Sequence, residues 1–210
     1  MNTQQAYNIW SEQYDTNENK TRDLEAISVR EHITRQGFES CLEIGCGTGK
    51  NTAWLITQAK QVLAVDLSEE MLAKAKKKIN SPKVTFIQAD ITKDWSFTGG
   101  NQFDLATFSL VLEHIENLDA IFAQLKKVMQ PNGMVYIGEL HPFKQYNGSK
   151  ARFETSEGVQ IVNCFNHHIT DFTEAARNNG FELITIQEYF DDNNRNTIPR
   201  ILTLLFKKTN

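Results

Sequence analysis

A glycine-rich turn that follows a short apolar run is the feature that most constrains the fold of this chain. The run Ser40–Ile44 predicts a buried β-strand, and residues 45–49 read Gly-Cys-Gly-Thr-Gly. Glycines at alternate positions permit a tight turn and let a ligand approach bare backbone. Because a helix is expected at 50–58, the ligand would lie at a helix N-terminus beside the carboxyl ends of the strands, where open α/β sheets bind ligands.

Strand and helix patterns alternate along the chain after this turn. Ser68 is expected to cap one helix, and another helix at 117–129 stops at the Pro-Asn-Gly run 131–133. This alternation predicts a parallel sheet with helices on both faces. The apolar runs that predict its further strands are 61–65, 84–88, 103–108 and 134–138.

The last part of the chain has a different pattern. After a helix expected at 171–178, two long strands are expected at 181–190 and 201–206, and they pair as a hairpin across a polar loop. The expected fold is therefore α/β, in one domain spanning 1–210. Its sheet has seven mostly parallel strands, helices on both faces and a C-terminal antiparallel hairpin.

Two segments lie outside the repeating pattern. An N-terminal helical cap is expected at about 1–37, with a leading helix at 24–36. An insert at about 140–168 follows the fifth strand and has little helical pattern. Long excursions of this kind are often functional lids, and a small hairpin that covers a sheet edge is the alternative.

Composition and charge argue against several classes of partner. The 210 residues carry a formal net charge of −4 and contain no long basic run. The densest basic cluster, Lys74 with 76–78, closes a predicted helix, where cations favour the negative helix end, so nucleic acid is not expected as a partner. No stretch reaches transmembrane length and no apolar signal region begins the sequence, so we expect a cytoplasmic location without membrane insertion.

Cysteine and histidine spacing does not indicate a metal site. The three cysteines, Cys41, Cys46 and Cys164, are odd in number and lack the paired spacing of a disulfide framework or a zinc site. The adjacent pair His167 and His168 would point in different directions. The sequence therefore predicts no bound metal.

The glycine turn does not match the two common phosphate-binding fingerprints. A dinucleotide fingerprint needs a third glycine where this chain has Lys50, and a P-loop needs Ser or Thr where it has Asn51. Glu43, at the entrance of the turn, would repel a pyrophosphate but can receive an ammonium group. S-Adenosylmethionine carries an ammonium and a sulfonium group and no phosphate.

Residues 42–52 resemble the first motif of the class I S-adenosylmethionine-dependent methyltransferases. Residues 62–72 resemble the second, in which an acidic residue that ends the second strand takes both ribose hydroxyls; here it is Asp66. Residues 86–91 resemble the third. There an acidic side chain, here Asp90, accepts from the adenine amino group, and the next backbone N–H meets the ring.

The resemblance extends over further segments. Residues 103–115 and 125–137 resemble the fourth and fifth motifs, and Trp10, Tyr14 and Asp15 are similar to the N-terminal segment that packs near the methionine end of the cofactor. The family implies a Rossmann-like methyltransferase fold, S-adenosylmethionine as cofactor and S-adenosylhomocysteine as product. The cofactor-binding residues that it implies are Tyr14, Glu43, Gly45, Cys46, Gly47, Gly49, Asp66, Leu67, Met71, Asp90, Ile91, Phe108 and Ser109.

Two histidines are candidate catalytic residues. His114 follows the fourth strand and can act as a base, or it packs around the cofactor. His141 follows the fifth strand, and Pro142 would hold its imidazole in place, either to line the acceptor pocket and act as a base or to stabilise the loop. In the insert, Tyr146 and Arg152 would bind an anionic acceptor, or they are solvated loop residues.

The similarity is to methyltransferases that act on small molecules by direct displacement at the sulfonium carbon. Residues 108–111 read Phe-Ser-Leu-Val, unlike the Asn-Pro-Pro-Tyr element of some amino-group methyltransferases, which disfavours nucleic-acid bases and protein glutamine as acceptors. The same motifs fit a non-catalytic S-adenosylmethionine-binding module or a subunit of a complex. A nicotinamide oxidoreductase is disfavoured by Lys50 and Glu43.

Overall fold

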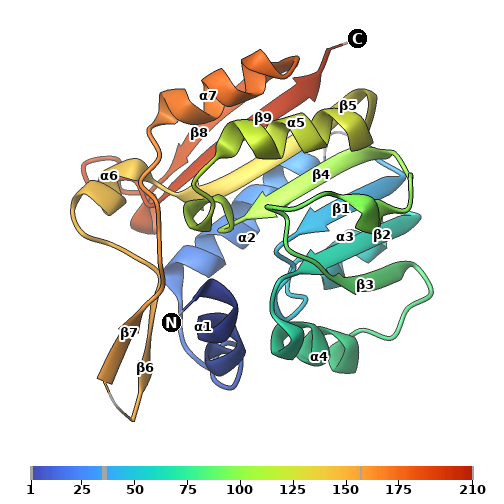
Figure 1. Cartoon of the computed structure of the whole chain (residues 1–210). Coiled ribbons are helices and arrows are strands. Elements are labelled where there is room, and N and C mark those ends of the chain that lie inside the picture. Colours follow the sequence, from blue (N-terminus) through green and yellow to red (C-terminus); the bar gives the residue numbers. More distant parts are fainter. Residues whose placement is uncertain (1, 35–36, 157, 210) are drawn as a thin grey trace.

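Figure 1 shows the computed structural model of the chain, which describes residues 2–34, 37–156 and 158–209. Seven strands of this part form one sheet in the order β3-β2-β1-β4-β5-β9-β8. Their bounds are β1 (Ser40–Ile44), β2 (Gln61–Asp66), β3 (Val84–Gln88), β4 (Phe103–Ser109), β5 (Met129–Leu140), β8 (Phe181–Tyr189) and β9 (Ile201–Lys208). The first five pair in parallel, whereas β9 is antiparallel to both β5 and β8. The predicted mixed sheet with a C-terminal antiparallel pair is confirmed.

Helices cover both faces of the sheet and bury its two sides separately. The main helices are α2 (Lys20–Ile33), α3 (Thr52–Gln58), α4 (Glu69–Lys78), α5 (Leu118–Val128) and α7 (Ile169–Asn178), and short 3-10 turns form η1 (Ser96–Thr98), η2 (Leu112–His114) and η3 (Asp191–Asn193). In β1, Leu42 and Ile44 join the core under α5 and α7, while Cys41 joins the core under α2 and α3. This is the alternation that a strand buried on both faces requires.

Local sequence signals set several element ends. Ser68 caps α4 as predicted, since its Oγ accepts from the backbone N–H of Met71 at 3.1 Å. The predicted start of the fifth strand at 134 is wrong, because β5 begins at Met129, directly after α5. The register between β4 and β5 shifts between Phe103 and Leu105, so the Pro-Asn-Gly run lies inside an irregular strand rather than before it.

The N-terminal segment contains a helix that was not predicted as a separate element. It is α1 (Thr3–Trp10), and α2 begins at Lys20, four residues before the expected start. The side chain of Asn19 caps α2 by accepting from the N–H of Arg22 at 3.0 Å. The expected end of the leading helix at 36 lies outside the described residues.

The N-terminal segment is docked on α4 and on the glycine turn. Ser68 Oγ donates to Asn8 Oδ1 at 2.6 Å, and Thr48 Oγ1 donates to Asp15 Oδ1 at 2.6 Å. Lys78 forms an ion pair with Asp15, and Lys74 donates to the carbonyl of Ser11. The basic cluster therefore binds the N-terminal segment in addition to closing its helix.

The insert forms a short helix and a hairpin. These are α6 (Pro142–Tyr146) and the strands β6 (Arg152–Thr155) and β7 (Gly158–Ile161), which pair only with each other among the described strands. Instead of covering a sheet edge, the hairpin lies beside α1 (Figure 1). The Phe153 and Trp10 rings stack there with centroids 5.3 Å apart. Within the described ranges, no helix has both the length and the apolar character needed to cross a membrane.

The strand β1 carries a buried acid. Glu43 is 4 % exposed, and its Oε2 accepts from Thr52 Oγ1 at 2.6 Å. Burial raises the pKa of Glu43 to about 8, against the opposing Thr52 hydrogen bond and with further raising contributions from Glu25 and Asp66. The folded chain therefore keeps a proton that the unfolded chain releases above about 4.5, the ordinary pKa of a glutamate.

This proton gives a pH-dependent stability. Between about pH 4.5 and 8 the folded state binds more protons than the unfolded state, so the contribution of Glu43 is present below this window and is lost as the pH rises through it. One proton corresponds to at most about 1.4 kcal/mol per pH unit. We expect Glu43→Gln to make the decline in unfolding free energy shallower over this window, measured by urea denaturation. Glu39→Gln, at an exposed position, is the control, and equal slopes for Glu43→Gln and the unmodified chain would contradict the prediction.

Candidate functional site

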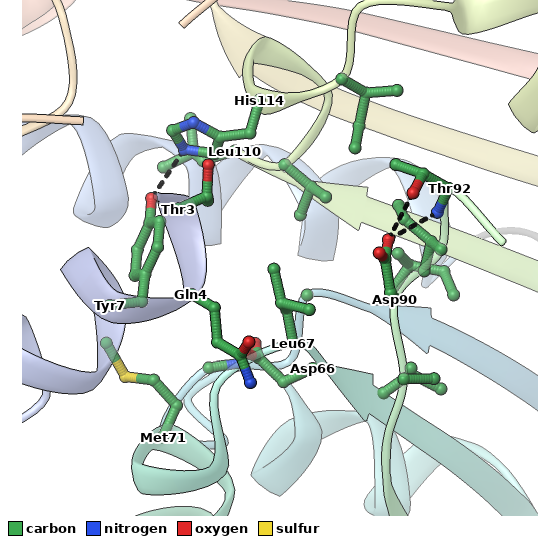
Figure 2. A pocket seen from close by; sticks show the side chains of 18 of the residues that line it. Thr3, Gln4, Tyr7, Asp66, Leu67, Met71, Asp90, Thr92, Leu110 and His114 are labelled. Carbon is green, nitrogen blue, oxygen red and sulfur yellow. Dashed lines mark hydrogen bonds between the residues drawn. The ribbon is translucent and has the colours of Figure 1, made fainter. Parts of the chain in front are cut away.

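A cavity of about 390 Å³ lies at the carboxyl ends of β1, β2, β3 and β4, with α1 contributing to its wall. Figure 2 shows Asp90 on the side of the cavity opposite Tyr7 and His114, with Asp66 below them near Gln4. The described residues that line it are Asn2, Thr3, Gln4, Tyr7, Tyr14, Ile44, Gly45, Gly47, Val65, Asp66, Leu67, Met71, Ala89, Asp90, Ile91, Thr92, Ser109, Leu110, Val111, His114 and Ile115.

The glycine turn brings bare backbone to the cavity. Gly45 and Gly47 have φ values of 73° and 55°, in the left-handed region that favours glycine. A Cβ at Gly45 would lie 2.1 Å from Cγ2 of Val111, so only glycine fits. The turn is also tied to β2, because the N–H of Gly45 donates to the carbonyl of Val65 at 2.7 Å.

Asp66 connects two turns at the cavity wall. Its Oδ2 accepts from the N–H of Gly47 at 2.8 Å, and its Oδ1 accepts from the N–H of Ser68 at 2.8 Å. Burial raises the pKa of Asp66, and these backbone hydrogen bonds oppose that rise. The side chain is therefore held in one orientation, with remaining acceptor capacity for hydroxyl donors of a ligand.

Asp90 provides a second fixed carboxylate. Its Oδ1 accepts from the N–H of Thr92 at 2.9 Å and from Thr92 Oγ1 at 2.6 Å, as Figure 2 shows. The apolar side chains of Leu67 and Ile91 line the same cavity. A flat ring that carries hydrogen-bond donors on its edge would suit this combination.

The loop after β4 is held in an unusual conformation. Leu110 has a φ of 59°, which is rare for a residue other than glycine, and its N–H donates to the carbonyl of Gly138 at 2.8 Å. The buried Glu139 Oε1 accepts from the N–H groups of Val111 and Leu112 at 2.9 and 2.8 Å. Burial, with a further contribution from Glu113, raises the pKa of Glu139 to about 8. Glu139 was not among the residues predicted for the site, although an acidic residue directly after an apolar strand can indicate a functional position.

Tyr7 and His114 form a hydrogen-bonded pair at the cavity. His114 Nδ1 lies 2.8 Å from the carbonyl of Asn163, which can only accept, so Nδ1 carries the proton and Nε2 accepts from the Tyr7 hydroxyl at 2.8 Å. Burial raises the pKa of Tyr7 well above its ordinary value, which keeps the hydroxyl protonated. Tyr7 was not among the residues predicted for the site. Its helical spacing from Trp10 and Tyr14 would have placed it on the same face as these two residues.

Many of the residues that the sequence singled out meet at this cavity. Those that line it are Tyr14, Gly45, Gly47, Asp66, Leu67, Met71, Asp90, Ile91, Ser109 and His114. The remaining four cofactor candidates are not among the lining residues: Glu43, Cys46, Gly49 and Phe108. Glu43 faces Thr52 instead, so its position gives no direct contact for a ligand ammonium group.

The structure does not bring His141 to the cavity. Its side chain is fully buried, with Nδ1 accepting from the N–H of Phe143 at 3.1 Å and Nε2 lying 3.0 Å from Glu188 Oε1. Burial lowers the pKa of His141, and Glu188 opposes that change. The position of His141, outside the described lining, fits the alternative, a hydrogen bond that stabilises the loop.

The two acceptor candidates in the insert also lie elsewhere. Tyr146 is half exposed, and its hydroxyl bonds to His168 Nδ1 at 2.5 Å. Arg152 is exposed on β6. Neither lines the cavity, because the insert turns outward to pack on α1.

The charge of the cavity lining is one-sided. Its acidic side chains are those of Asp66 and Asp90, and no lysine or arginine is among the described lining residues. This lining suits a cationic or neutral ligand and does not suit a pyrophosphate.

The comparisons with known proteins agree with this geometry. Residues 42–137 match a family model described as a methyltransferase domain. An uncharacterized methyltransferase of Emericella nidulans is 23 % identical over 89 % of this chain and 78 % of its own length. A malonyl-[acyl-carrier protein] O-methyltransferase of Halalkalibacterium halodurans is 34 % identical over 58 % of this chain and 46 % of its own length.

A solved structure shares the fold over the full length. The N-methyltransferase NodS of Bradyrhizobium japonicum, in complex with S-adenosylhomocysteine, has a TM-score of 0.73 and 17 % identity, with 100 % of both chains covered. The chain spans about half the length of most of the curated relatives it matches. Residues 42–137 therefore match a methyltransferase domain, and the strand order and the cavity at the glycine turn support a class I S-adenosylmethionine-dependent methyltransferase.

Proposed function

We propose that the chain transfers the methyl group of S-adenosylmethionine to a small-molecule acceptor. The observation that carries the proposal is the cavity in which Asp66 and Asp90 flank the glycine turn, with no lysine or arginine among the described lining residues. A cofactor with a ribose, an adenine and two cationic groups matches these acceptor groups. A dinucleotide carries a pyrophosphate, for which the described lining offers no lysine or arginine.

The adenosyl part of the cofactor has matching side chains in the cavity. Asp66 is placed to accept from the ribose hydroxyls, and Asp90 from the adenine amino group, with Leu67 and Ile91 against the ring. The turn at Gly45 and Gly47 offers backbone at close approach for the methionine part.

The protein contributes alignment to the reaction. When bound, the cofactor supplies a methyl group that is already activated by its sulfonium. Tyr7 lies at the cavity with its hydroxyl donated to His114, so its oxygen keeps lone pairs that can orient an acceptor through an N–H or O–H group. Of the two candidate catalytic histidines, we propose His114, acting through Tyr7, as the positioning group.

The acceptor that fits this lining is an amine or another neutral or cationic molecule. Asp66 and Asp90 are assigned to the cofactor, so the group left to meet the acceptor is the Tyr7 hydroxyl oxygen, which accepts from an N–H or O–H donor. Malonyl-[acyl-carrier protein] O-methyltransferase, by its name, acts on an oxygen acceptor, and NodS is named an N-methyltransferase. The described lining contains no lysine or arginine to bind an anionic acceptor, and we therefore propose the second type of acceptor for this chain.

We expect Asp66→Ala to weaken S-adenosylmethionine binding at least about tenfold, because a hydrogen bond to a charged group contributes roughly 1.5–3 kcal/mol. Isothermal titration calorimetry measures the affinity. Asp66→Asn keeps the size of the side chain and separates loss of the ligand contact from collapse of the turn. Asp23→Ala, at an exposed position, is the control. Unchanged affinity in both Asp66 variants would overturn the ribose assignment.

An acceptor screen tests the reaction itself. Radiolabelled S-adenosylmethionine is incubated with the chain and a matched panel of small amines and small carboxylic acids, and label transfer is counted. We expect transfer to amines, and we expect Tyr7→Phe to lower turnover at least about tenfold while cofactor affinity stays within about twofold. Transfer to carboxylic acids alone would contradict the proposed acceptor class. Cofactor binding without transfer to any acceptor would favour a non-catalytic binding module.

A further inference from the structure

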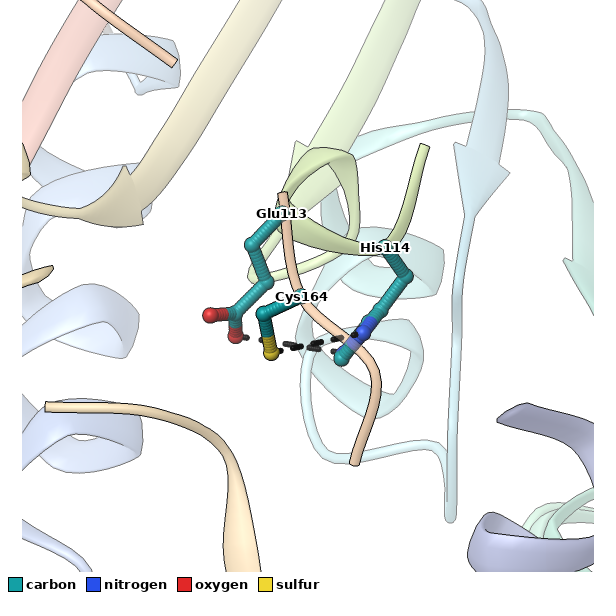
Figure 3. Close-up of side chains that lie close together, drawn as sticks. All are labelled: Glu113, His114 and Cys164. Carbon is teal, nitrogen blue, oxygen red and sulfur yellow. Dashed lines mark hydrogen bonds and ion pairs between the residues drawn. The ribbon is translucent and has the colours of Figure 1, made fainter. Parts of the chain in front are cut away.

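Three side chains with metal-binding atoms converge beside the cavity. Figure 3 shows Glu113 and His114, from η2, facing Cys164, from the segment after β7. Cys164 Sγ lies 3.8 Å from His114 Nδ1, and Glu113 Oε1 lies 3.9 Å from His114 Nε2. One ligand atom from each residue lies within 4.8 Å of the others.

The fold holds these residues together although 50 positions separate Cys164 from His114. The N–H of Phe165 donates to the carbonyl of Glu113 at 2.7 Å, and His114 Nδ1 donates to the carbonyl of Asn163 at 2.8 Å. These two bonds fix the backbone on either side of Cys164 against η2. The sequence predicted no metal because spacing along the chain does not reveal this pairing.

Glu113 provides an independent indication of a missing partner. Its side chain is 6 % exposed, and its buried Oε2 has no hydrogen-bond partner among the residues that the structure describes. A buried carboxylate oxygen without a donor is costly, because it has lost its water without compensation. Cys164 and Gln145 interact with this carboxyl group but leave Oε2 without a donor, so a cation held by both carboxylate oxygens would supply that compensation.

We propose that Glu113, one ring nitrogen of His114 and Cys164 form a binding site for a thiophilic divalent ion of the zinc type. Thiolate, imidazole and carboxylate together are ligands that zinc accepts in a tetrahedral site, and a set of three leaves one position open. Ligands of one tetrahedral zinc lie about 3.4–3.6 Å apart, so side-chain movements of about 1 Å would close the site.

Binding has a defined chemical balance. The S–H bond of Cys164 breaks, a sulfur–metal bond forms and the proton leaves to water, so the oxidation state of sulfur does not change. The imidazole binds the ion through Nε2, which has the lone pair and gives up the Tyr7 hydroxyl, while Nδ1 keeps its proton and its bond to the carbonyl of Asn163. Because His114 also lines the cavity, the ion would lie in the cavity wall.

Titration of the cofactor-free chain with Co²⁺ tests the site, with Zn²⁺ added in competition. We expect the visible absorption bands of tetrahedral cobalt and a thiolate-to-cobalt charge-transfer band in the near ultraviolet. Cys164→Ser should abolish the charge-transfer band, and Glu113→Gln should weaken Zn²⁺ binding at least about tenfold. Cys41→Ala, which removes a buried thiol in β1, should keep the charge-transfer band. Circular dichroism shows whether each variant is folded.

The outcomes are separable from those for the cofactor site, because no S-adenosylmethionine is present. Absence of a charge-transfer band in the unmodified chain would overturn the proposal. So would a band that persists in Cys164→Ser and disappears in Cys41→Ala. If Cys164→Ser does not fold, equal Zn²⁺ affinity of Glu113→Gln and the unmodified chain would overturn it.

Discussion

The carboxylate of Asp66 is the constraint on which the rest of the site depends. One of its oxygens accepts from the turn after β1, at Gly47, and the other accepts from the turn after β2, at Ser68. Ser68 in turn caps α4 and donates to Asn8, which docks α1 over the cavity. Asp66 therefore links the ends of β1 and β2 directly. Through Ser68 these strand ends are also linked to α4 and α1.

Sequence signals identified the features that local chemistry determines. The strand Ser40–Ile44 and the glycine turn follow from apolar pattern and backbone conformation, and the cap at Ser68 follows from side-chain type. Asp66 and Asp90 come directly after parallel strands, whose carboxyl ends meet at one edge of the sheet, so their position at the cavity could be inferred without coordinates.

Contacts between distant segments could not be read in the same way. The bond between Tyr7 and His114 joins residues 107 positions apart, and it depends on how α1 docks. His141 illustrates the opposite error. Its neighbour Pro142 suggested a fixed imidazole beside the acceptor, but the imidazole lies 3.0 Å from Glu188 on β8, and His141 is not among the described lining residues. The pairing of Cys164 with η2 is equally invisible along the chain.

The central claim is that the turn held by Asp66 forms a site for S-adenosylmethionine and not for a pyrophosphate cofactor. Isothermal titration of the unmodified chain with S-adenosylmethionine, S-adenosylhomocysteine and NADH, at matched concentrations, tests it most directly. The geometry and lining charge predict saturable binding of both adenosyl compounds and no binding of NADH. Binding of NADH alone would contradict the account and would mean that the glycine turn holds a phosphate after all.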